Sequence, residues 1–211
     1  VTCLCMIGYM IAGMSSFNAI AHAMTTVATG GFSTFDTSFF SFPSAGAESV
    51  AILFMFMGGL PFIIYLHAMR GNIRPFFKDA QVRFFSLLVL TLIAFMSLFL
   101  VLQDIHPPLE AIRRSAFSII AIITGTGYAN AYYDEWGNFS IAFFFFLMFI
   151  GGCAGSTSCG LKIFRFQILL SVISTHLKKL LHPHGMITPQ YNNHAIPAGV
   201  PSAVMSFFFL Y

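Results

Sequence analysis

The sequence predicts an all-α membrane protein in which one unit, a helix followed by a re-entrant short helix, a glycine-containing strand and a second helix, is repeated. Hydrophobic residues make up 57% of the 211 residues and charged residues 8%, whereas ordinary soluble domains have about 25% charged residues. Long uncharged segments alternate with shorter apolar ones, and two of the shorter ones share a pattern. We therefore expect lipid to surround most of the chain.

Two segments are long enough to cross a bilayer, which takes about 20 mainly apolar residues. They are residues 50–69 and 84–102. Pro61 follows two glycines in the first segment, and we expect a kink there because proline removes a backbone hydrogen bond and crowds the preceding turn. The apolar segments 1–14 and 198–211 are incomplete, which predicts a longer parent chain and gives no reason to read a signal peptide at the start.

A third uncharged segment, residues 137–161, cannot be one regular helix. Glycine and hydroxyl residues dominate residues 151–160, and each glycine in a helix costs about 1 kcal/mol relative to alanine. Non-helical backbone at membrane depth survives only where protein or a water-filled cavity satisfies its polar groups. We expect a broken helix that resumes near Leu161 and runs to about Leu181.

The charged residues divide between two predicted sides of the membrane. One side holds Arg70, Arg74, Lys78, Arg83, Lys162, Arg165, Lys178 and Lys179. The other holds Asp36, Glu48, Asp104, Glu110, Asp134 and Glu135, with Arg113 and Arg114 as its basic residues. Since cytoplasmic loops are enriched in lysine and arginine, the first side is predicted to be cytoplasmic. The formal net charge of +3 is thus a sign of topology and not of nucleic-acid binding.

Residues 16–32 and 109–129 are too short to span a membrane and too apolar for ordinary loops, and each runs from a helical pattern into a Thr-Gly turn. We expect Thr29-Gly30 and Thr126-Gly127 to be equivalent. Selectivity filters replace the hydration shell of an ion with rings of backbone carbonyls, and glycine supplies the backbone freedom that this requires. The candidate filter residues are Ala28, Thr29, Gly30, Gly31, Gly125, Thr126, Gly127 and Tyr128.

The strings around these motifs resemble TrkH and TrkG in the superfamily of Trk, Ktr and HKT potassium and sodium transporters. The matching strings are residues 22–26, 29–34, 54–66, 79–85 and 146–167. In that family four linked repeats surround one pore. The resemblance implies a second repeat at residues 1–69, a cytoplasmic linker at 70–83, a third repeat at 84–181, a cytoplasmic loop at 182–197 and the start of a fourth repeat at 198–211.

The resemblance also implies a function and partners. It implies a subunit of a potassium uptake system, multi-pass in a bacterial inner membrane, with K⁺, or Na⁺ or Rb⁺, as the transported ion and no bound cofactor. It further implies a homodimer docked on a cytosolic nucleotide-binding regulator resembling TrkA. One departure is Gly125, where a family member is expected to have threonine in its third filter.

Residues 151–160 resemble the intramembrane loop that obstructs the pore in this family. The candidate gating residues are Gly151, Gly152, Gly155, Ser156, Thr157, Ser158 and Gly160. The alternative is a static break that permits close helix packing. Lys162 and Arg165 border the loop, where they could reduce cation occupancy, pair with carboxylates or extend to the membrane interface.

Other chemistries have weaker signals. The four cysteines, Cys3, Cys5, Cys153 and Cys159, lack metal-type spacing, which favours buried free thiols over disulfides or zinc. His182, His184 and His194 could form a metal or pH-sensing site, but a polar turn is the simpler interpretation. Glu110, Asp134 and Glu135 either concentrate cations at a pore mouth or belong to a solvated loop.

Two rival functions remain. A secondary transporter could bind a small solute or Na⁺ at discontinuous helices. An intramembrane enzyme would need a pair of catalytic groups, and none is convincing, so we expect no enzymatic activity.

Overall fold

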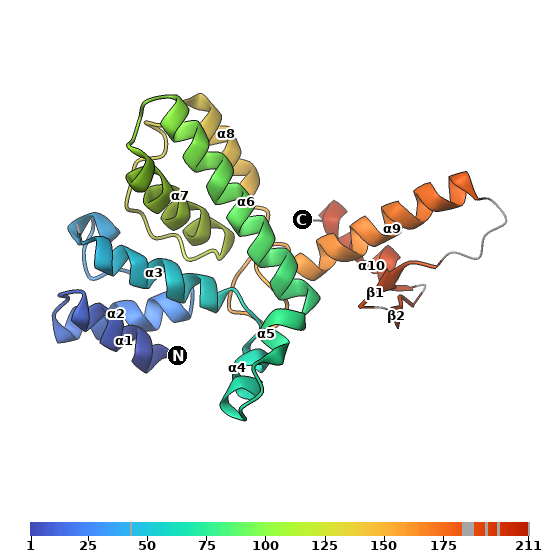
Figure 1. Cartoon of the computed structure of the whole chain (residues 1–211), viewed down its shortest axis with the longest axis horizontal. Helices are drawn as coiled ribbons and strands as arrows, with labels where there is room; N and C mark the ends of the chain where they lie inside the picture. The colour runs from blue at the N-terminus through green and yellow to red at the C-terminus, as the bar shows by residue number, and fades with distance from the viewer. Residues whose placement is uncertain (43, 183–187, 193, 198, 211) are drawn as a thin grey trace.

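The computed structural model describes residues 1–42, 44–182, 188–192, 194–197 and 199–210 (Figure 1). Helices dominate this part of the chain. They are α1 (Thr2–Ile11), α2 (Ser16–Val27), the 3-10 helix η1 (Ser38–Ser41), α3 (Ala45–Gly58), α4 (Phe62–Met69), α5 (Arg74–Lys78), α6 (Ala80–Leu102), α7 (Pro108–Ile123), α8 (Asn138–Leu147), α9 (Ile163–Leu181) and α10 (Gly199–Leu210). Two short antiparallel strands, β1 (Gln190–Tyr191) and β2 (His194–Ala195), follow α9. The all-α prediction is confirmed.

Helices α1 to α8 form one body, and the two short helices α2 and α7 lie within it. α2 packs against α1 and α3, while α7 packs against α3, α6 and α8. Alanine and serine at Ala111, Ser115 and Ala121 let neighbours approach α7 closely, and all three are fully buried. Both short helices were predicted; α7 is mostly buried, whereas α2 exposes Phe17, Ile20 and Met24 along one face.

Helix α6 is the longest apolar element. The Asp79 carboxylate caps its first turn by accepting hydrogen bonds from the backbone N–H groups of Gln81 (2.8 Å) and Val82 (3.2 Å). Leucines such as Leu87 and Leu98 lie exposed along its length. Within the described residues, α6 alone has the length and composition of a membrane span, and α3 with α4 would make a second if counted together.

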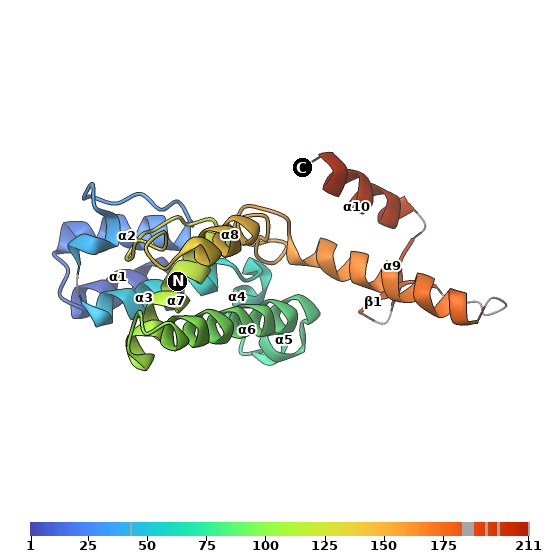
Figure 2. The same cartoon turned by 90° about the horizontal axis from the view of Figure 1, so that it is seen from above.

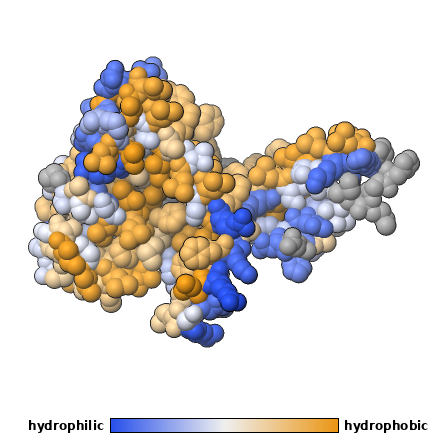
Figure 3. Space-filling model, viewed as in Figure 1, coloured by the Kyte–Doolittle hydropathy of each residue, from blue (hydrophilic) through white to orange (hydrophobic). Residues whose placement is uncertain are grey.

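Hydrophilic residues gather at the two ends of α6, with a broad apolar surface between them (Figure 3). The basic linker, with exposed Arg70, Arg74 and Lys78, lies at the N-terminal end of α6. The start of α9 reaches the same end, because Gln167 Nε2 donates a hydrogen bond to the Ala80 carbonyl oxygen (2.9 Å). The first basic cluster and the start of the second therefore lie together, as the charge pattern predicted.

The expectation of one kinked helix over residues 50–69 is wrong. The chain forms two helices, α3 and α4, that meet at 98°. The break lies where it was predicted, between Gly58 and Phe62, but the chain turns by almost a right angle there. Packing leaves no room for a side chain at Gly59 in this turn, because a Cβ there would lie 2.9 Å from the Phe85 ring.

Two smaller boundaries also differ from prediction. The linker at residues 70–83 contains α5 and the first turn of α6, so α6 begins at Ala80 and not at residue 84. The broken segment was predicted correctly, since α8 ends at Leu147 and α9 runs from Ile163 to Leu181. Helix α9 projects from the body, and α10 packs along it (Figure 2).

Candidate functional site

The turns that follow α2 and α7 begin along the same backbone path. They then diverge, because Gly30 N–H donates five residues back, to Thr25 (2.7 Å), whereas Gly127 N–H donates six residues back, to Ala121 (3.0 Å). The capping residues Ala28 and Thr124 are both right-handed. The next residues, Thr29 (φ 52°) and Gly125 (φ 71°), are both left-handed. Each donates its N–H three residues back, to Thr26 (3.2 Å) and Ile122 (3.0 Å) respectively.

The second left-handed residue of each turn is Gly31 (φ 70°) or Gly127 (φ 77°). The equivalent pairs are therefore Thr29 with Gly125, Gly30 with Thr126, and Gly31 with Gly127. The predicted pairing of Thr29-Gly30 with Thr126-Gly127 is wrong by one residue. The two Thr-Gly dipeptides occupy different places in their turns, because backbone conformation and not residue identity sets the register.

The same register explains the unusual Gly125. A β-branched residue with positive φ is strained, so Thr29 holds a costly conformation that glycine at residue 125 adopts freely. Space matters as well, since a Cβ on Gly125 would lie 3.2 Å from the Cβ of Cys159 in the loop.

The two turns meet at Gly31 and Thr126. A Cβ on Gly31 would overlap the carbonyl oxygen of Thr126. The Thr124 hydroxyl donates to the Ile120 carbonyl oxygen (2.7 Å) and lies 2.8 Å from the Thr126 hydroxyl. Exposed backbone at Gly30 and Gly127 lies beside this contact.

The side chain of Tyr128 points away from the turn and into the neighbouring unit. Its hydroxyl lies 2.5 Å from the Thr25 hydroxyl, accepts from the Thr26 hydroxyl (3.3 Å), and donates to the His22 carbonyl oxygen (3.3 Å). The His22 ring is fully buried beside the Tyr128 ring, with 6.1 Å between centroids. Tyr128 thus braces α2 from the other unit, a role that its place in the sequence did not indicate.

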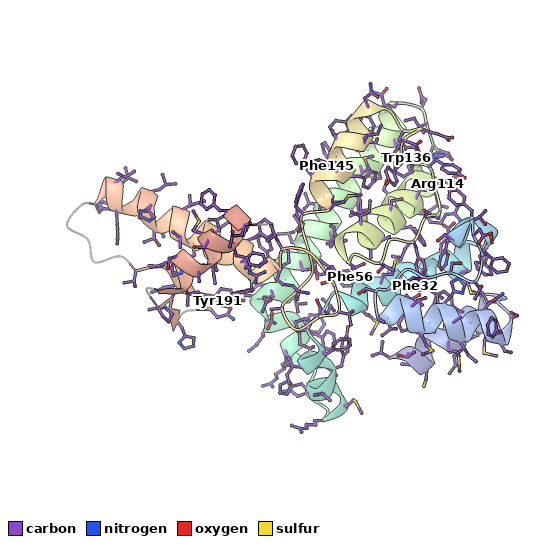
Figure 4. All side chains as sticks on the ribbon, turned by 180° about the vertical axis from the view of Figure 1, so that it is seen from behind. Phe32, Phe56, Arg114, Trp136, Phe145 and Tyr191 are labelled. Atoms are coloured by element: carbon purple, nitrogen blue, oxygen red, sulfur yellow. The ribbon has the colours of Figure 1, made fainter. Side chains whose placement is uncertain are left out.

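Ion pairs occupy the N-terminal half of α7. Arg113 Nε lies 3.2 Å from Glu48 Oε2, which joins α7 to α3, and Arg114 Nε donates to Glu110 Oε1 at 2.7 Å. Arg114 also donates to the Asn130 carbonyl oxygen (3.2 Å). The hydrogen bond from Arg114 lowers the pKa of the Glu110 carboxyl. Figure 4 shows Arg114 and Trp136 at this end of the molecule, away from Phe32 and Phe56 near its middle.

The loop at residues 151–160 docks on the bend between α3 and α4. Because α3 ends at Gly58, three residues before Pro61, the carbonyls of Gly58 and Gly59 lack helical donors. Cys153 N–H donates to Gly59 (2.9 Å) and Thr157 N–H to Gly58 (3.3 Å). In return, Phe62 N–H donates to the Gly155 carbonyl oxygen (3.0 Å). The two broken helices thus satisfy each other's backbone, so protein supplies the partners of these polar groups.

The remaining glycines and serines close the loop on itself. Gly151 N–H donates to Leu161 (2.9 Å), and a Cβ on Gly151 would overlap the Cys159 carbonyl oxygen. Gly152 N–H donates to the Ser158 hydroxyl (2.9 Å). Ser156 donates its hydroxyl to the Cys153 carbonyl oxygen (2.6 Å).

Lys162 and Arg165 form no carboxylate pair within the described residues. The Lys162 ammonium donates to the Ser158 carbonyl oxygen and lies 3.4 Å from the Ser156 hydroxyl. The Arg165 guanidinium lies 3.6 Å from the centroid of the Phe207 ring on α10. Lys162 therefore binds the loop, and Arg165 stacks on an aromatic ring.

The weaker signals are only partly resolved. Cys5 and Cys153 are buried as expected, while Cys3 and Cys159 are exposed, so the prediction of burial is wrong for two of the four. His194 is exposed in β2, and His184 lies outside the described residues. No group of three potential metal ligands occurs in the part of the chain that the structure describes.

Comparisons with known proteins find relatives over the whole chain. The family model described as TrkH, cation transport protein, matches residues 2–210. The chain is 37% identical to the Trk system potassium uptake protein TrkI of Halomonas elongata, over 100% of the chain and 43% of the relative. It is 30% identical to TrkH of Escherichia coli K12, over 100% of the chain and 44% of the relative.

A solved structure is similar over nearly the same range. The crystal structure of the potassium transporter TrkH from Vibrio parahaemolyticus superimposes with a TM-score of 0.93 at 31% identity, covering 99% of this chain and 45% of that one. The chain thus spans less than half the length of the relatives it matches.

Proposed function

The chain belongs to the TrkH family of cation transport proteins, whose members are membrane transporters, and from this premise we propose that it supplies two of the units that line a K⁺ pathway. The carbonyls of Ala28 to Gly31 and of Gly125 to Tyr128 would replace water around the ion. The observation that carries this proposal is the meeting of the two turns at Gly31 and Thr126. Two unrelated turns are not expected to contact each other and also to have left-handed residues at equivalent positions.

The loop at residues 151–160 is the proposed barrier of this pathway. It lies against both units at once, because Thr157 contacts Val27 at the end of α2 and Cys159 lies under Gly125. Hydrogen bonds from the loop to the α3–α4 bend and to α2 hold it in place, so the loop can move when these bonds break, without the unwinding of a regular helix. By family resemblance, the proposal includes a homodimer in a bacterial inner membrane that docks on a TrkA-like regulator.

The test uses the full-length protein that contains this chain, reconstituted into proteoliposomes. The ratio of K⁺ uptake to Na⁺ uptake tests the filter, and removal of residues 154–156 tests the barrier. We expect K⁺ preference in the first measurement, and in the second a higher uptake that depends less on the regulator. A normally folded shortened protein with fully regulated, unchanged uptake would assign the loop to static packing.

A secondary transporter remains the second candidate, because α3–α4 and α8–α9 are discontinuous helices that meet, and such transporters bind their substrates at broken helices. This function requires uptake of K⁺ or a small solute to depend on a co-transported ion. Uptake driven by the K⁺ gradient alone, with no dependence on Na⁺ or pH gradients, would exclude it.

A further inference from the structure

Thr157 links the loop to the end of helix α2. Its hydroxyl lies within hydrogen-bond distance of the Val27 carbonyl oxygen (3.2 Å) and the Gly58 carbonyl oxygen (3.1 Å), which share its one proton, and its backbone N–H donates to Gly58 (3.3 Å). Val27 is the last residue of α2, so its carbonyl lacks a helical donor. The loop supplies that donor from 130 residues further along the chain.

The space around this contact is closely filled. A Cβ on Gly58 would lie 3.1 Å from Thr29 Cγ2, 3.2 Å from the Val27 carbonyl oxygen and 3.4 Å from the Thr157 hydroxyl. The left-handed, buried Thr29 therefore packs against the end of α3, two residues after the Val27 carbonyl that Thr157 contacts. Strained conformations of this kind persist only where the surroundings fix them.

We propose that Thr157 is a positioning residue that couples the place of the loop to the geometry of the turn at Thr29. The inference rests on the proposed function, in which this turn binds the ion and the loop is the barrier. With the loop docked, the Thr157 hydroxyl holds the Val27 carbonyl, two residues before Thr29. When the loop withdraws, that carbonyl loses its donor and the strained turn is free to relax, so basal uptake past a docked loop has a higher K⁺ preference than uptake through the open pathway.

The test compares Thr157→Val, which keeps the shape but removes the donor, with Thr157→Ser, which keeps the donor. Thr91→Val is the matched control, because the Thr91 hydroxyl bonds the Leu87 carbonyl oxygen (2.8 Å) on the exposed side of α6. Each full-length variant is reconstituted with and without the regulator. Radioactive rubidium uptake and the ratio of K⁺ to Na⁺ uptake are measured at equal protein incorporation.

We expect Thr157→Val to raise uptake without the regulator by about fivefold, the equivalent of one net hydrogen bond, and to lower the K⁺ to Na⁺ ratio. Thr157→Ser and Thr91→Val should match the wild type in both measurements. A residue that served stability alone would change the melting temperature and leave the ion ratio unaltered, and that result would overturn the coupling.

Failure of this inference can be told from failure of the proposed function. If removal of residues 154–156 raises uptake but Thr157→Val alters neither uptake nor the ion ratio, the loop is the barrier and Thr157 does not couple it to the turn. If shortening the loop also changes nothing, the barrier itself is wrong, and the coupling falls with it.

Discussion

Gly31 faces the carbonyl group of Thr126 across the boundary between two repeated units, so closely that a methyl group on residue 31 would occupy the position of that oxygen. The two residues are 95 positions apart in the chain. Gly30, its neighbour, has an ordinary φ, and a Cβ there would first meet the Phe32 ring at 3.5 Å. Substitution of Gly31 should therefore be more disruptive than substitution of its neighbour Gly30.

We predict that Gly31→Ala lowers K⁺ uptake of the full-length protein by about tenfold or more, because a backbone carbonyl must shift and the left-handed φ becomes strained. Gly127→Ala should be intermediate, since its φ is 77° but open space surrounds it. Gly30→Ala should stay within about twofold of wild type. Flux assays with K⁺ and Na⁺ check this order, and an equal loss at Gly30 and Gly31 would restore the Thr29-Gly30 register.

A second prediction concerns the brace at Tyr128. Tyr128→Phe removes a buried hydroxyl that contacts Thr25, Thr26 and His22, which should cost about 1 kcal/mol of stability. It should also weaken the preference for K⁺ over Na⁺, because α2 and the turn at Tyr128 are no longer tied together. Tyr132→Phe is the control, since the exposed Tyr132 ring stacks on Phe40 at the surface. Thermal melting and ion-ratio measurements should separate the two variants.

A third prediction ranks the two ion pairs of α7. Glu48 is 10% exposed and joins α7 to α3, whereas Glu110 is 31% exposed and pairs with Arg114 one turn away on the same helix. Glu48→Gln should therefore destabilise the protein by about 1–3 kcal/mol, because Arg113 loses its partner in a partly buried place. Glu110→Gln should cost about 0.5 kcal/mol. A double-mutant cycle with Arg113→Gln would measure the coupling, and a coupling near zero would mean that the pair adds nothing between the units.

A fourth prediction tests the contact between Gly125 and Cys159. Gly125→Ala should reduce uptake, because the new Cβ meets Cys159 at 3.2 Å and the left-handed backbone is strained. Adding Cys159→Gly removes the crowding but not the strain, so the double variant should recover uptake only in part. The residual loss corresponds to about 1 kcal/mol, the usual cost of a left-handed conformation. No recovery at all would show that the loop does not lie under this turn while the protein works.

The sequence by itself determined the elements of this protein, because local composition governs them. Uncharged apolar runs predicted α6, the patterns after residues 16 and 109 predicted α2 and α7, and glycine content predicted the break after α8. The glycines and the proline of residues 58–61 likewise predicted an interruption at Pro61. Family resemblance was also readable at this level, since it lies in short strings of residues.

Only the tertiary structure decided how these elements join. The bend of 98° at Pro61 is stable because the loop at residues 151–160, far along the chain, supplies the hydrogen bonds that the bend leaves unmade. The contact of Gly31 with Thr126, the brace of Tyr128 on α2 and the bond from Thr157 to Val27 likewise join residues about 100 positions or more apart. Such contacts leave no periodic trace in a sequence, because each needs just one side chain or one glycine at a place that packing selects.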